Sequence, residues 1–191
     1  MKTKYFSLLL LLVVGLLSFS GCDDDDNTTE FLNYDGPNFT APTNPAGLTT
    51  YAAYFPASVT QDFVGRRLSG VDFWLTNIPQ QTVLVIYGYS GNEAIPGDEL
   101  YRIDLTQRVS VTGDFTSHLI PGGLDIPADG LWLTVETTIA ADGLQSIGCD
   151  QGENYSPNGD RMFRNGEWTS FNTLVPTETV NWNIRGVLAT E

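Results

Sequence analysis

The chain has 191 residues, with 9 Lys and Arg against 23 Asp and Glu and a formal net charge of −14, so its length suits about one domain. Hydrophobic residues make up 41 % of it and aromatic residues 12 %, which supplies a packed core and excludes wholesale disorder. Both lysines lie in the first four residues and every acid lies at Asp23 or later. Phosphate backbones repel such an acidic chain, so no nucleic acid is expected among its partners.

Residues 1–21 have the pattern of a secretory signal peptide. The apolar run Ser7–Ser18 follows the two lysines and is shorter than the roughly 20 residues of a membrane-spanning helix. It leads into Phe19-Ser20-Gly21-Cys22, which resembles the lipobox of bacterial lipoproteins, with Phe19 in place of the commoner leucine. The resemblance implies acylation of Cys22 and a lipid anchor in a membrane. The alternative is an ordinary cleaved signal with a chance cysteine.

Residues 22–47 are expected to form an acidic, flexible tether. Asp23–Asp26 resembles the export tag that Gram-negative bacteria place on lipoproteins displayed on the outer face of the outer membrane. This favours a cell-surface location over a periplasm-facing one. The rest is rich in Asp, Asn, Thr, Pro and Gly without a sustained period, as in linkers. Aromatic residues between Phe31 and Phe39 leave open that part of the tether packs on the domain.

Residues 48–191 predict an all-β domain, folded as a single β-sandwich of jelly-roll-like topology. Short runs alternate with period two and are separated by Gly, Pro, Asn and Asp, which is typical of strands in antiparallel sheets. Asn165-Gly166 is a strong hairpin signal. The expected strands are 71–76, 82–89, 100–105, 131–137, the hairpin 162–171 and the closing strand 180–188.

Several segments together carry a family resemblance. They include Leu68–Thr76 (LSGVDFWLT), Thr82–Tyr87 (TVLVIY), Ile126–Val135 (IPADGLWLTV) and Asn181–Arg185 (NWNIR). In order and spacing they resemble the β-sandwich accessory modules of secreted bacterial proteases and adhesins. The resemblance implies a module for attachment or display without a catalytic role of its own.

The composition gives little support to catalysis, and no catalytic residue is predicted. His118 is the only histidine, so it cannot form a multi-histidine zinc site. No serine stands in a G-x-S-x-G elbow that would make it a nucleophile beside that histidine. Cys149 is expected to be a small buried hydrophobe. A glycan-acting hydrolase with Glu136 as one of two carboxylates is the least favoured reading.

A loop rich in oxygen donors raises the question of calcium, the one cofactor considered. The run Asp150–Asp160 contains the candidate ligands Asp150, Glu153, Asn158 and Asp160, and calcium prefers six to eight oxygens. The EF-hand pattern is absent because no glutamate stands at the twelfth position from Asp150. The alternative is a solvated turn, where Asp, Asn and Gly are common.

The main functional candidate is a binding site for a glycan. Strand parity places Trp74 with Asp72, and Trp132 with Glu136, on the nominally outward sides of two strands. Aromatic rings stack on sugar faces while carboxylates accept from hydroxyls. Large aromatics in a sandwich are also often core residues, and Trp168 fits either place. We therefore expect a binding or adhesion module for a glycan or a surface protein; the alternative is a structural subunit of an envelope complex.

Overall fold

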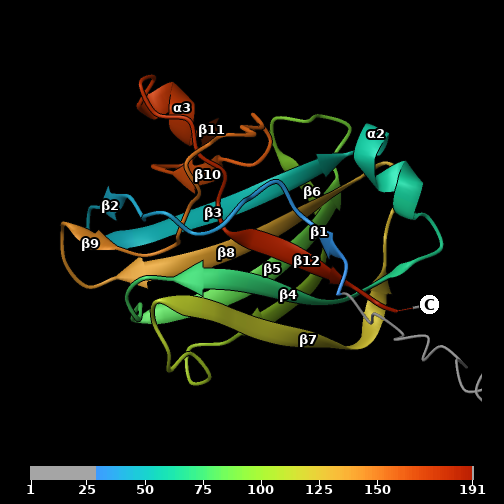
Figure 1. Ribbon diagram of the computed structural model, residues 1–191, viewed down its shortest axis with the longest axis horizontal. Helices are drawn as coiled ribbons and strands as arrows, with labels where there is room; N and C mark the ends of the chain where they lie inside the picture. Colours follow the sequence, from blue (N-terminus) through green and yellow to red (C-terminus); the bar gives the residue numbers. More distant parts are fainter. Residues whose placement is uncertain (1–28, 191) are drawn as a thin grey trace, which may run out of the picture.

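The computed structural model describes residues 29–190 (Figure 1). The predicted signal peptide, Cys22 and Asp23–Asp26 lie outside the described residues. Strands make up 51 % and helices 7 % of the structure. Two antiparallel sheets pack face to face, which confirms the all-β sandwich predicted from the sequence.

The smaller sheet has four strands. Its order is β1 (Phe31–Leu32), β12 (Ile184–Leu188), β4 (Arg67–Leu75) and β7 (Asp114–Asp125). Neighbours in this order are distant in sequence, as in jelly rolls, where strands pair across long connections.

The larger sheet has six strands. Its order is β11 (Glu167–Ser170), β10 (Arg161–Arg164), β3 (Gly47–Pro56), β8 (Gly130–Ile139), β5 (Gln81–Tyr89) and β6 (Pro96–Asp104). Asn165 and Gly166 join β10 to β11 with positive φ angles of 54° and 89°, which is the conformation that a two-residue hairpin requires.

The remaining elements are short. They are α2 (Ala57–Thr60), η1 (Gln61–Phe63), α3 (Phe171–Leu174) and a two-stranded ribbon of β2 (Thr43–Asn44) and β9 (Leu144–Gln145).

The core lies between the sheets and is built from alternate residues of each strand. Phe73 and Leu75 point inward from β4, and Leu84, Leu133 and Val135 point inward from the larger sheet. All five are fully buried. The parity predicted for β4 and β8 is therefore confirmed, and burial of the apolar faces is the main stabilising contribution.

Two strands differ from the sequence prediction. Strand β7 contains Pro121-Gly122-Gly123, which the sequence marks as a turn, but the chain continues pairing through it with a register shift opposite Leu68 and Gly70. Gly122 and Gly123 have φ angles of 76° and 66°, so these glycines form a bulge within one strand. Strand β3 has seven consecutive buried residues, which hides the alternation that would have predicted it.

The second half of the predicted tether belongs to the folded domain. Leu32 is buried and β1 pairs with β12. The Tyr34 ring stacks on Phe55 at 4.8 Å between centroids. The folded domain therefore begins near Phe31, ahead of the predicted boundary at residue 48, because these side chains cover apolar surface that the sandwich alone would leave exposed.

Candidate functional site

A hollow with aromatic walls lies on the outer face of the six-stranded sheet, and we call it the aromatic pocket. Its volume is about 220 Å³. It is lined by Leu48, Thr50, Tyr87, Pro96, Glu136, Phe163 and Trp168. Strands β3, β5, β6, β8, β10 and β11 all contribute, so the pocket exists only when the whole sheet is assembled.

The strand register places four of these residues in one row across the sheet. Trp168 pairs with Phe163, Phe163 with Thr50, and Thr50 with Glu136. Side chains at paired positions project to the same face about 5 Å apart. Two aromatic rings, a hydroxyl and a carboxylate therefore lie side by side, with the rings of Phe163 and Trp168 5.4 Å apart.

A buried aromatic layer supports the pocket from below. The rings of Trp132 and Tyr54 stack at 4.7 Å, and Trp168 packs edge-on against Trp132 at 5.2 Å. Trp132 has the outward parity expected of it, but its exposure is 0 %, so the expectation of an accessible Trp132 ring is wrong. Trp168, Tyr87 and Tyr89 pack against this layer and cover it. Trp168 and Tyr87 are half-buried and lie at the surface that the sequence suggested for Trp132.

Glu136, the other half of that predicted pair, does line the pocket. Arg102 donates to both of its carboxylate oxygens, at 3.1 and 3.2 Å, and to Glu99 at 2.7 Å. The two carboxylates raise the pKa of Arg102, chiefly through these hydrogen bonds. Glu136 is held in place by a guanidinium that itself has two acidic partners, and each carboxylate oxygen keeps room for a further donor.

The Tyr87 hydroxyl stands beside this ion pair. It accepts from Arg102 at 3.4 Å. Burial, followed by the charge of Glu136, raises the pKa of Tyr87. The phenol therefore stays protonated, and its O–H is available to an acceptor on a ligand.

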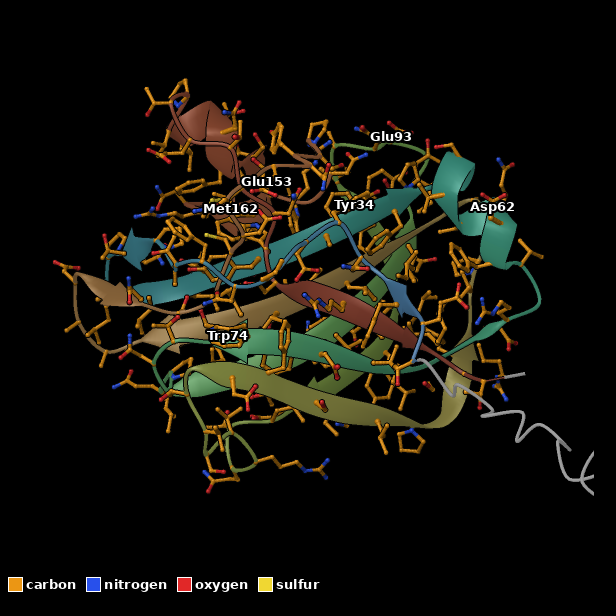
Figure 2. The ribbon with its side chains drawn as sticks, viewed as in Figure 1. Tyr34, Asp62, Trp74, Glu93, Glu153 and Met162 are labelled. Atoms are coloured by element: carbon orange, nitrogen blue, oxygen red, sulfur yellow. The ribbon has the colours of Figure 1, made fainter. Side chains whose placement is uncertain are left out.

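The second predicted pair, Trp74 with Asp72, lies on the other side of the sandwich. Both project from β4 on the outer face of the four-stranded sheet, where Figure 2 labels Trp74. The Trp74 ring meets Phe115 edge-on at 5.3 Å. Burial raises the pKa of Asp72, while Ser117 and Arg185 oppose that rise. The four predicted ligand-binding residues therefore do not form one site, because the core separates the two sheets.

The four candidate calcium ligands do not converge either. Asp150 already accepts from four N–H groups, those of Gly36, Gly152 and both the backbone and the amide of Asn181. Asn158 accepts from Arg161, and the buried Asp160 accepts from the backbone of Asn172. Within residues 29–190, no group of three or more His, Cys, Asp or Glu is placed to hold a metal ion.

Asp150 and Glu153 instead line a separate hollow of about 280 Å³ between their loop and residues 36–39; Figure 2 labels Glu153 above β3. The four N–H groups leave the Asp150 oxygens little capacity for a cation. Its role is structural, since it joins this loop to the segment that precedes β2 and to Asn181.

The residues considered for nucleophilic chemistry are internal. His118 is buried and bonds through Nε2 to the Tyr101 hydroxyl at 2.8 Å. Cys149 is fully buried, as predicted, and burial raises the pKa of its thiol to about 12. A thiol so protonated is a poor nucleophile.

The sequence did not single out Tyr87, Phe163 or Arg102 as functional residues. Tyr87 ends a nearly continuous apolar run, in which the sequence does not distinguish the outward side chains from the inward ones of Leu84 and Ile86. The order of strands in the sheet, which brings it to Trp168, has no local signal in the sequence.

Comparisons with known proteins support the fold. No protein-family model and no curated protein sequence matches the chain significantly. A solved structure of the clostridial cysteine protease Cwp84 after propeptide cleavage is similar, with a TM-score of 0.59 and 14 % identity over 87 % of this chain and 41 % of that one. A structure of the cysteine protease and lectin-like domains of Cwp84, a surface layer associated protein of Clostridium difficile, gives 0.56 and 13 % over 87 % and 37 %.

At such low identity the similarity shows a shared fold alone. The chain spans less than half the length of both matched chains. Among residues 29–190, no helix is both long and apolar enough to cross a bilayer.

Proposed function

We propose that the protein is a non-enzymatic, glycan-binding module held at the outer surface of the cell by a lipid on Cys22. The observation that carries the proposal is the aromatic pocket, in which Trp168 and Tyr87 stand beside Glu136. A ring can cover the C–H face of a sugar while the carboxylate accepts from its hydroxyls. The similarity to a protein with a domain described as lectin-like supports this use of the fold.

The pocket is small for other classes of ligand. At about 220 Å³ it lies below the roughly 300–1,000 Å³ of sites that enclose drug-sized molecules. A single sugar ring, with the rest of the glycan extending over the sheet, suits this size.

Binding of the full chain, purified in detergent, to a panel of immobilised glycans tests the proposal. Trp168→Ala removes the half-buried ring that lines the pocket, so we expect at least about a tenfold loss of affinity for any glycan that binds, which corresponds to about 1.4 kcal/mol. Trp74→Ala is the matched control, because it removes a half-buried tryptophan from the opposite face. Binding that survives Trp168→Ala and disappears with Trp74→Ala would move the site to the four-stranded sheet.

A protein ligand or an envelope complex remains the alternative use of this surface. Large exposed apolar side chains are found on many elements, with Leu119 of β7 73 % and Phe39 63 % exposed. They come from separate strands and loops and mark no single contact face, so the aromatic pocket carries the stronger argument.

A further inference from the structure

We infer that the aromatic pocket selects for uncharged sugars and rejects sugars that bear a carboxylate or sulfate. This inference rests on the proposed function and adds the chemical class of the ligand. Its basis is the charge at the pocket: Glu136 is the only charged residue among the seven that line it.

The nearest cation is not available to a ligand anion. Arg102 uses Nε on Glu99 and both terminal nitrogens on Glu136. A guanidinium has five N–H donors, and a fourth reaches the Tyr87 hydroxyl. Two carboxylates share one guanidinium here, so an incoming anion meets excess negative charge. Arg102 has no two N–H groups free to bind that anion together.

The other arginine on this face points elsewhere. Arg161 of β10 donates from Nη2 to Asn158 at 3.0 Å and does not line the pocket. Glu136, with its side chain only 20 % exposed, is partly shielded from water, which strengthens its repulsion of a like charge. Sugar hydroxyls meet no such penalty, because they donate to the free lone pairs of the carboxylate.

The test compares each neutral polysaccharide with its own acidic form. Amylose, galactan and glucomannan are immobilised as they are and after oxidation of their primary hydroxyls to carboxylates, and binding of the full chain is measured at 20 and 300 mM NaCl. We expect the oxidised form to bind about tenfold more weakly at low salt. This difference in affinity between the two forms, which we call the gap, should narrow at high salt, where the Debye length falls below 10 Å.

Two variants separate charge from the loss of a hydroxyl contact. Glu136→Gln removes the repelling charge and frees donors of Arg102, so it should bring the affinities for the neutral and oxidised forms closer together. The double variant Glu136→Gln/Glu99→Gln should bind the oxidised form more tightly than the neutral one. Asp62→Asn removes the same charge from η1, far from β10 and β11 (Figure 2), and should leave the gap unchanged.

Equal binding of the two forms, or a gap that neither salt nor Glu136→Gln relieves, would overturn the charge selection while leaving glycan binding intact. Binding of the oxidised forms alone would likewise overturn the charge selection and leave glycan binding intact. If neither form of any polysaccharide binds, the proposed function fails and this inference fails with it.

Discussion

The Asp35 carboxylate joins the N-terminal segment to the four-stranded sheet. Its side chain is fully buried and accepts from Asn33, Asn183 and the guanidinium of Arg185, with the shortest arginine contacts at 2.8 Å. The guanidinium also lies over the Phe115 ring at 4.3 Å. Each partner is thus held from several sides, which is the arrangement in which losing one charge is most costly.

We expect Asp35→Ala to lower the free energy of unfolding by about 3 kcal/mol, because the part-buried guanidinium of Arg185 loses its carboxylate partner and two amides lose one of their acceptors. Urea unfolding of the variant measures this. Glu30→Ala is the control: it removes a half-exposed partner of Arg66 and should cost less than about 1 kcal/mol. Equal losses for the two variants would contradict the assigned role of Asp35.

The single histidine makes stability depend on pH. Burial, followed by the charge of Arg108, lowers the pKa of His118 below 6.5. The unfolded chain therefore binds a proton at a higher pH than the folded chain does. The stability that the neutral imidazole contributes is present in full above about pH 6.5 and is lost as the pH falls below it.

Wild type and His118→Gln should accordingly differ in the slope of stability against pH. Urea midpoints at pH 7.5 and 5.5 are the measurement, and the fall between them should be smaller in the variant. Burial raises the pKa of Asp160, so protonation of Asp160 stabilises the fold as the pH falls further. Asp160 is present in both proteins, so the difference between their slopes reports His118 alone. Identical slopes would show that His118 is equally easy to protonate in both states.

Among the structural elements, the segment from β1 to β2 has the least visible signal in the sequence. It pairs with β12 through Phe31 and Leu32, stacks Tyr34 on Phe55, and bonds Thr40 to Cys149 at 2.8 Å. Its Asn, Pro, Thr and Gly content is typical of a linker, yet it acts as part of the fold.

Two truncations test this. A chain that begins at Thr29 should keep the melting temperature of the longer chain, whereas one that begins at Leu48 should melt at least about 8 °C lower, since it loses more than about 2 kcal/mol of packing and ion-pair energy. Thermal unfolding followed by circular dichroism distinguishes them. Equal melting temperatures of the two truncated chains would show that the folded domain begins at residue 48, as predicted from the sequence.

The longer strands could be predicted because their signal is local. In β4 and β8, period-two alternation identifies both the strand and its inward face. Strand β7 was missed because Gly122 and Gly123 make a bulge that has the sequence of a turn. Of the candidate site, Glu136 was predicted. The residues Tyr87, Phe163 and Arg102 come to Glu136 only through the pairing of β8 with β5 and of β3 with β8 and β10, which are strands remote in sequence.

In the whole molecule, β1 and the C-terminal end of β12 lie at one end of the sandwich, and β10 and β11 lie toward the other (Figure 1). The backbone contact from Leu188 to Glu30 at 3.0 Å fixes the first end. Phe31 is the ninth residue after Cys22, so the two are at most roughly 30 Å apart when the chain is fully extended. A lipid on Cys22 would therefore hold the domain close to the membrane by the end remote from β10 and β11.

Replacement of Cys22 by serine tests the anchor. The wild-type chain should partition into the detergent phase and the membrane fraction, and Cys22→Ser should move to the aqueous phase, because the acyl chains supply the membrane affinity. Protease treatment of intact cells then reports the exposed location. Membrane retention of Cys22→Ser would argue against lipidation.

Length, composition and alternation determine by themselves that this chain is acidic and has an all-β fold, because those features act locally along the chain. The placement of Trp132 under Trp168, the separation of Trp74 from Glu136 by the core, and the engagement of Asp150 by backbone N–H groups were decided only in the tertiary structure. The physical reason is that strand parity specifies two faces but not the neighbours that cover them. Those neighbours come from strand order and register, which are set by packing across the whole sandwich.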